Sequence, residues 1–90
     1  MTKVNHVNER IRDFILEKFP LARKRGVTFQ DDLLEGGVLD SLGILDVVAF
    51  LEQDFRIHVN DEELIPENFQ SIDRLSVFVQ DKISCAAQPQ

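Results

Sequence analysis

The stretch Gly37-Val38-Leu39-Asp40-Ser41-Leu42 marks the point where a long connection is expected to become a helix. Asp40 is a good N-cap residue, because its carboxylate can accept the unpaired N–H groups of a first helical turn. The third residue after it is Gly43 rather than Glu or Gln, so no reciprocal capping box is expected. Gly36-Gly37 allows the backbone to turn tightly just before this point. The pattern therefore places Ser41 at a helix start, with its hydroxyl toward solvent.

The helix that begins at Ser41 is expected to run to about Phe55 and is apolar on nearly every side. At about 100° per residue, one face is apolar except for Asp54 at its margin, and we expect this face in the core. Its members are Ile44, Val47, Val48, Leu51 and Phe55. The second face mixes apolar with charged side chains, and unpaired charges resist burial. We call its apolar members the docking strip: Leu42, Leu45 and Ala49.

Acidic and polar residues, Asp46, Glu52 and Gln53, are interleaved with the docking strip. An exposed apolar patch with a polar rim on a small protein is a candidate surface for binding another protein. The predicted docking residues are Asp40, Leu42, Leu45, Asp46, Ala49 and Glu52. The alternative is that another helix or the preceding connection covers the strip.

A first helix is expected from an Asn5 cap to about Phe19, where Pro20 ends it. A long connection over residues 20–39 follows, and connections of this length are often functional. Its tip, Arg23-Lys24-Arg25, is either a phosphate or nucleic-acid contact or, more simply, a solvated turn. Four apolar residues should pin the connection onto the core: Val27, Phe29, Leu33 and Leu34.

A short helix is expected from an Asn60 cap, with a Glu at its third position, to about Ile65, where Pro66 stops it. The last helix is expected over residues 72–83, followed by a frayed tail at residues 85–90. No strand pattern of useful length is present. The sequence therefore predicts an all-α fold with three longer helices and one short helix.

Ninety residues make one small domain, with its core at about residues 5–84. The net charge of −6 is uneven, because residues 1–39 hold seven basic and six acidic side chains, whereas residues 40–83 hold three basic and ten acidic. An acidic half argues against nucleic acid and favours protein partners with basic patches. The single cysteine, Cys85, allows no internal disulfide, which fits a reducing compartment.

The sequence lacks the features of a membrane or secreted chain. No apolar run is long enough to span a bilayer, and the first residues lack the apolar region of a signal peptide. Cys85-Ala86-Ala87-Gln88 has the form of a prenylation box, but such a box must end the chain and Pro89-Gln90 follows it. We expect a cytoplasmic monomer without stable membrane insertion.

Metal and catalytic sites are not expected. His6 and His58 are the only histidines, and neither has a cysteine or a paired carboxylate at ligand spacing. The acidic run at residues 61–63 lacks the twelve-residue loop of an EF-hand. Ser41 has no neighbouring base and no Gly-x-Ser-x-Gly motif, which disfavours a hydrolase triad. The pattern favours a serine that another enzyme modifies, in a chain that is not itself an enzyme.

Asp40-Ser41-Leu42 resembles the Asp-Ser-Leu signature of acyl carrier proteins and their peptidyl and aminoacyl carrier relatives. The residues around it extend the likeness. The run at residues 31–39 is similar to the family's loop before the serine, and residues 51–59 are similar to the end of its second helix and the segment after it. Pro66-Glu67-Asn68-Phe69 and a final helix follow. The resemblance covers about residues 5–84.

The resemblance implies an acyl-carrier-protein-like four-helix bundle. It also implies that a separate phosphopantetheinyl transferase attaches 4′-phosphopantetheine to Ser41. The arm would then carry acyl or aminoacyl groups as thioesters between loading and transfer enzymes of fatty-acid, polyketide or related specialised biosynthesis. The helix that starts at Ser41 would be the main recognition element, and Asp40 would help to hold the magnesium ion of the transferase.

Three residues depart from the fatty-acid type of carrier. Gly43 stands where those carriers usually have an acid, Ile44 is more apolar than usual, and Gln53 dilutes the acids. Asp-Ser-Leu-Gly is closer to some D-alanyl and peptidyl carriers. A stand-alone acyl carrier and an aminoacyl, peptidyl or D-alanyl carrier therefore both stay open. An unmodified helical interaction module is the more remote alternative.

Overall fold

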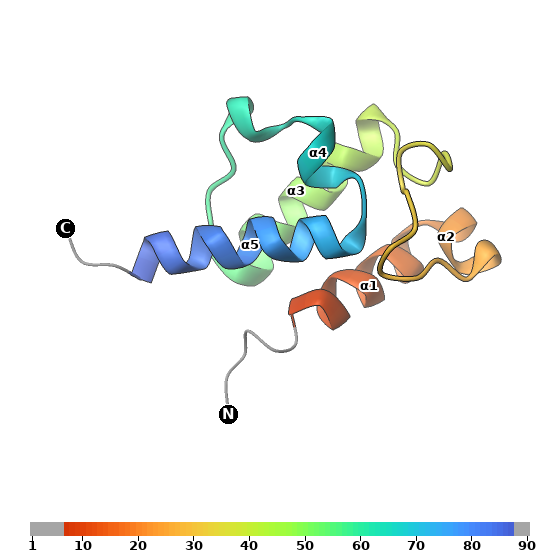
Figure 1. Ribbon diagram of the computed structural model, residues 1–90, viewed down its shortest axis with the longest axis horizontal. Helices are drawn as coiled ribbons and strands as arrows, with labels where there is room; N and C mark the ends of the chain where they lie inside the picture. The colour runs from red at the N-terminus through yellow and green to blue at the C-terminus, as the bar shows by residue number, and fades with distance from the viewer. Residues whose placement is uncertain (1–6, 88–90) are drawn as a thin grey trace.

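The computed structural model describes residues 7–87, and every regular element within that range is helical. The longer helices are α1 (Val7–Lys18), α3 (Ser41–Phe55) and α5 (Ile72–Ala87). The shorter elements are α2 (Pro20–Arg25), α4 (Pro66–Phe69) and the 3₁₀ turn η2 (Asp61–Glu63). Figure 1 shows α5 lying across α3, with α1 beside it and α2 at one end of the bundle. The predicted all-α bundle with three longer helices is confirmed.

The core lies where the three longer helices meet, because each has one apolar stripe. The most deeply buried members are Val7, Ile11 and Ile15 of α1, Val47 and Leu51 of α3, and Ile72, Leu75 and Val79 of α5. The remaining members of the predicted core face of α3, Ile44, Val48 and Phe55, are partly buried against this cluster. Phe69 of α4 fills the space between the elements and is fully buried.

Two prolines begin helices in this structure. Pro20 ends α1 as predicted, but it is also the first residue of α2, which the sequence analysis treated as connection. Pro66 was predicted to stop a short helix, and it instead starts α4. The expected helix from Asn60 is reduced to the 3₁₀ turn η2. Both prolines can begin a helix because a proline at the first helical position loses no hydrogen bond and already has the required φ.

The last helix is longer than predicted. It continues through Ala87, so residues 85–87, expected to belong to a frayed tail, are helical. Alanine is the strongest helix former, which accounts for the extension. Residues 88–90 and the predicted Asn5 cap lie outside the described part of the chain.

Candidate functional site

Ser41 is the first residue of α3, and its side chain is exposed. Asp40 precedes it in an extended conformation, with φ −113° and ψ −170°. The Gly43 N–H donates a hydrogen bond of 2.7 Å to Asp40 Oδ1, so the predicted N-cap is confirmed. The N–H groups of the first turn, together with the helix dipole, make this end of α3 favourable for an anion.

The backbone turns sharply just before Ser41. Gly37 has φ +79°, a conformation that side-chain-bearing residues rarely adopt. Arg25 Nη1 reaches across from α2 and donates a hydrogen bond to the Gly36 carbonyl. The turn predicted from the glycine pair is therefore present, and an arginine of the basic tip holds it.

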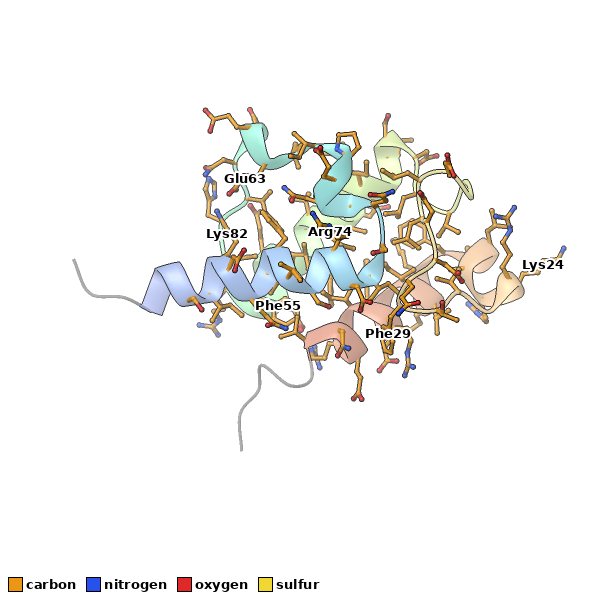
Figure 2. The ribbon with its side chains drawn as sticks, in the orientation of Figure 1. Lys24, Phe29, Phe55, Glu63, Arg74 and Lys82 are labelled. Atoms are coloured by element: carbon orange, nitrogen blue, oxygen red, sulfur yellow. The ribbon has the colours of Figure 1, made fainter. Side chains whose placement is uncertain are left out.

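The basic tip is mostly engaged within the protein. Arg23 donates hydrogen bonds to the carbonyls of Leu16 (3.2 Å) and Glu17 (3.3 Å) at the end of α1. Arg25 bonds the glycine turn, as described above. Lys24 points away from the bundle in Figure 2. Two of the three cations thus donate hydrogen bonds to backbone carbonyls. The sequence favoured a solvated turn here and did not predict these bonds.

The connection before Ser41 is tied to the start of α5. The Leu33 N–H donates to the Gln70 carbonyl at 2.7 Å, and the Asp73 N–H donates to the Phe29 carbonyl at 3.0 Å. Of the predicted apolar anchors, Val27 and Leu33 are buried, while Phe29 and Leu34 are partly buried against the core. The prediction that apolar side chains pin the connection is confirmed.

Asp32 stabilises this connection electrostatically. Its Oδ1 accepts hydrogen bonds from the N–H groups of Leu34 (3.0 Å) and Glu35 (2.7 Å). Its Oδ2 accepts one from Gln70 Nε2 at 3.1 Å. The bond from the Glu35 N–H, followed by that from Gln70, lowers the pKa of Asp32, and burial opposes this effect. An ionised Asp32 therefore helps to fix the path of the chain toward Ser41.

Gly43 is buried beneath the ring of Phe19, at the junction between α1 and α2. A Cβ atom at Gly43 would lie 3.0 Å from Phe19 Cε1 and 3.2 Å from Asp40 Oδ1. The start of α3 thus approaches another element closely, and a side chain at this position would press on the Phe19 ring unless the ring shifted. The sequence shows an unusual glycine in the first turn of the helix, but it does not show that Phe19 packs against this glycine.

The docking strip is exposed in the structure. Leu42 retains 72% of its accessible surface and Leu45 retains 56%. Ala49 and Asp46 are also exposed. The alternative that another helix or the connection covers the strip is therefore excluded for the described residues. Leu42, Leu45, Asp46 and Ala49 have the i, i+3, i+4, i+7 spacing of one helix face, so the structure brings them together.

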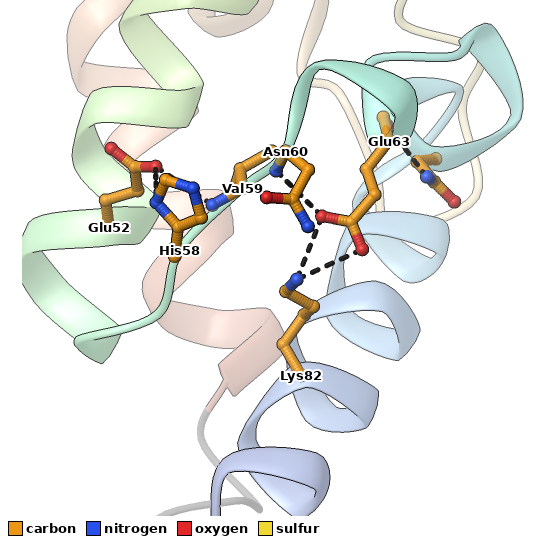
Figure 3. Close-up of polar contacts among 7 residues, drawn as sticks. Glu52, His58, Val59, Asn60, Glu63 and Lys82 are labelled. Carbon is orange, nitrogen blue, oxygen red and sulfur yellow. Dashed lines mark hydrogen bonds and ion pairs between the residues drawn. The ribbon is translucent and has the colours of Figure 1, made fainter.

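Glu52 has a structural role that the sequence analysis did not foresee. Its Oε2 accepts the N–H of Val59 at 2.9 Å and lies 3.7 Å from His58 Nδ1 (Figure 3). It thereby holds the return segment, residues 56–59, against the end of α3. Its side chain is about one-third exposed, so only part of it is accessible beside the docking strip.

The far side of the return segment is held by Glu63. Lys82 Nζ of α5 donates to both carboxylate oxygens, at 2.9 and 3.0 Å, and the Asn60 N–H donates to Oε1 at 2.9 Å (Figure 3). Glu63 thus caps the Asn60 N–H as predicted, while the Glu63 N–H donates to the Asn60 carbonyl at 2.9 Å. The hydrogen bond from Lys82 is the largest cause of the lowered pKa of Glu63, and burial opposes it.

A hydrolytic arrangement is absent from the described residues. His58 is at the opposite end of α3 from Ser41, beside Glu52. At a rise of about 1.5 Å per residue, about 16 Å of helix separates Glu52 from Ser41. His6 lies outside the described residues. Residues 7–87 also contain no group of three or more His, Cys, Asp or Glu side chains that could hold a metal ion.

No helix in the described part of the chain combines the length and the apolar character needed to cross a membrane.

Comparisons with known proteins give a consistent result, although no family model matches the chain. A probable acyl carrier protein, PigG, of Serratia sp. (strain ATCC 39006) is 28% identical over 74 residues, which cover 82% of this chain and 85% of that protein. The acyl carrier protein of Buchnera aphidicola subsp. Acyrthosiphon pisum (strain 5A) is 29% identical over 82 residues, covering 88% and 95%.

A solved structure is similar as well. The solution NMR structure of holo acyl carrier protein NE2163 from Nitrosomonas europaea matches with a TM-score of 0.70 and 30% sequence identity. The match covers 88% of this chain and 96% of that one. This chain therefore spans most of the length of each of these relatives.

Proposed function

The chain belongs to the acyl carrier protein family, and from that premise we propose that Ser41 bears the 4′-phosphopantetheine arm. A covalent arm of this kind supplies the thiol on which an acyl carrier protein holds its cargo as a thioester. Acyl cargo is favoured over the aminoacyl, peptidyl and D-alanyl cargo that the sequence left open, because the relatives are named acyl carrier proteins.

The observation that carries the proposal is the exposure of Ser41 at the start of a long helix. The sequence has four serines. Ser71 and Ser76 are buried, so their hydroxyls are shielded from an enzyme. Ser84 is exposed but lies within α5, where backbone N–H groups are already bonded inside the helix. Ser41 alone among them combines access with a helix N-terminus.

The residues around Ser41 fit a phosphodiester. The first-turn N–H groups favour negative charge, and the side chain projects from the surface, where an arm has room. Asp40 uses Oδ1 to cap Gly43, and no described residue donates to its Oδ2. In our proposal this second oxygen helps to hold the magnesium ion of the transferase close to the Ser41 hydroxyl.

The proposed partners are a phosphopantetheinyl transferase, which loads the arm from coenzyme A, and the enzymes that charge the arm and take the acyl group from it. The protein acts as a carrier, and we propose that it catalyses no step itself. A flexible arm raises the local concentration of cargo at each docked enzyme. We further propose that residues 5–84 form one carrier domain that works in the cytoplasm, which the cysteine content supports.

Intact-mass spectrometry tests the proposal. The purified chain, incubated with coenzyme A and a phosphopantetheinyl transferase, should gain one phosphopantetheine. Ser41→Ala should remain folded, because Ser41 is exposed, and should gain nothing. Ser84→Ala removes an exposed serine elsewhere and should gain as much as the wild type. Continued labelling of Ser41→Ala would show that the assignment is wrong.

A further inference from the structure

Backbone hydrogen bonds close the turn that precedes Ser41. The Gly37 N–H donates to the Leu34 carbonyl at 3.2 Å, and the Leu39 N–H donates to the Leu33 carbonyl at 3.0 Å. The second of these bonds lies only two residues before Ser41. The conformation of the turn therefore sets the direction in which the chain enters α3, and a turn that changed shape would move the serine hydroxyl.

The side chain of Arg25, the last residue of α2, contacts this turn from outside. Its Nη1 donates a hydrogen bond to the Gly36 carbonyl, and a Cβ atom at Gly36 would lie 3.0 Å from the same nitrogen. The guanidinium thus lies directly against the glycine. The two residues are 11 positions apart in the sequence, so this bond is a tertiary contact that ties the turn to α2.

α2 is itself anchored to the rest of the bundle. Arg23 donates hydrogen bonds to two carbonyls at the end of α1, and Ala22 is fully buried. Phe19, the residue before α2, packs against Gly43 in the first turn of α3. Phe19 and Arg25 therefore contact the chain on either side of Ser41, and both contacts start from the same fixed element.

We propose that Arg25 is a positioning residue for the modification of Ser41, because it holds the glycine turn against α2 and so keeps the serine hydroxyl in the orientation that the transferase uses. The proposal rests on the assignment of Ser41 as the attachment residue. Arg25 acts through the backbone, since its hydrogen bond goes to the Gly36 carbonyl. The rate of a reaction between bound groups depends steeply on their alignment, and a displacement of about 1 Å can lower it about 100-fold.

Three variants of the full chain test the proposal. Arg25→Met removes the donor and keeps the apolar stem of the side chain. Arg25→Lys keeps a donor at the end of a stem of similar length, and a single bond to a carbonyl does not require the guanidinium fork. Lys24→Met is the matched control, because it removes the neighbouring cation of the same helix, whose side chain points away from the bundle in Figure 2.

Amide hydrogen exchange, followed by NMR, measures the order of the turn without any transferase. In Arg25→Met the Gly37 and Leu39 N–H groups should exchange about fivefold faster, because the turn loses one supporting hydrogen bond. Arg25→Lys should restore most of the protection, and Lys24→Met should match the wild type. Exchange within α1 and α5 should be unchanged in every variant, which shows in the same experiment that the bundle is folded.

The kinetics of arm transfer, with a purified phosphopantetheinyl transferase and coenzyme A, measure the consequence for Ser41. Arg25→Met should lower kcat about three- to tenfold and leave the KM values for the carrier and for coenzyme A within about twofold. This split is expected because the binding surfaces are intact while the hydroxyl is less well aligned in the transition state. Arg25→Lys should recover most of the lost kcat, and Lys24→Met should behave as the wild type.

Three results would overturn the proposal. Unchanged exchange at Gly37 and Leu39 in Arg25→Met would show that the arginine does not order the turn. Faster exchange with unchanged kcat would leave Arg25 a structural residue only. A raised KM with unchanged kcat would indicate that Arg25 contacts coenzyme A or the transferase directly. Each of these, with normal uptake by the wild type, refutes this proposal alone, whereas a wild type that gains no phosphopantetheine refutes the proposed function and this proposal with it.

Discussion

At the scale of single residues, Gly43 shows how packing shapes the signature around Ser41. The glycine lets the ring of Phe19 approach the first turn of α3, and a Cβ atom would lie 3.0 Å from that ring. An acid at this position would have to displace Phe19, which itself contacts Phe14 edge to face. The departure from the fatty-acid type of carrier thus has a local structural cause and does not by itself indicate a different cargo.

A double-mutant cycle tests this cause. Helix propensity alone predicts that Gly43→Ala raises the free energy of unfolding by about 1 kcal/mol. In the wild type the change should fall short of this gain, because the added Cβ atom meets the Phe19 ring. In a Phe19→Leu background the aromatic edge is gone, so Gly43→Ala should be more favourable by at least about 0.5 kcal/mol. Chemical denaturation of the four proteins measures the coupling. Additive effects would show that Phe19 does not limit this position.

Ser76 is a second residue whose environment makes a definite prediction. Its hydroxyl is buried in α5 and has no hydrogen-bond partner, so folding removes water from it without compensation. Ser76→Ala should therefore raise the free energy of unfolding by about 1 kcal/mol. Ser84→Ala, on the exposed part of the same helix, should give only the propensity gain of about 0.5 kcal/mol. Equal gains from the two substitutions would contradict this account.

At the scale of elements, the end of α3 is strained at one position. Arg56 has φ +59° and ψ +44°, the left-handed conformation in which glycine usually ends a helix. Arg56→Gly should raise the free energy of unfolding by about 0.5–1 kcal/mol, because it relieves this strain. Arg56→Ala keeps the Cβ atom and should stay near the wild type. A thermal or urea titration distinguishes the two, and a gain from both would point to the charge of Arg56 instead.

The link between Lys82 of α5 and Glu63, the last residue of η2, predicts a pH dependence. Lys82 lowers the pKa of Glu63 in the folded state, so the ionised carboxylate is stabilised by folding. This contribution is complete above the pKa of an unfolded glutamate, and it is lost as the pH falls through the lower folded pKa. Lys82→Met retains the apolar stem and should cost about 1 kcal/mol at about pH 7.

The difference between Lys82→Met and the wild type should shrink as the pH falls through the lowered pKa of Glu63, because a protonated carboxyl group no longer attracts Lys82 as an anion. Urea titrations across this range measure it. A difference that persists unchanged at acid pH would mean that Lys82 stabilises the fold through its stem, or through its position 5.9 Å from the Phe78 ring, rather than through Glu63.

At the scale of the whole molecule, the sequence was sufficient where periodicity and capping decide the structure. It predicted α3 to its ends, the Asp40 cap and the exposed docking strip, since apolar spacing and the positions of charges determine these features. It failed at α2 and α4, because Pro20 and Pro66 were treated only as helix breakers. A proline can end one helix or begin the next, and tertiary packing decides which of the two occurs.

The candidate site was predictable in its local part and not in its tertiary part. Ser41 and Asp40 are adjacent in sequence, so their geometry follows from the helix start. The hydrogen bond from Arg25 to the glycine turn, the engagement of Glu52 and the Phe19 contact depend on how distant segments meet. No local pattern contains that information.

The central claim is that the arm is attached to Ser41, and localisation by tandem mass spectrometry tests it most directly. Cleavage after arginine and lysine releases residues 26–56 as one peptide, whose only hydroxyl side chains are Thr28 and Ser41. After incubation with coenzyme A and the transferase, fragment ions should place the phosphopantetheine on Ser41 and leave the fragments that contain Thr28 but not Ser41 unmodified. Phosphopantetheine on Thr28, or on any peptide other than this one, would contradict the claim.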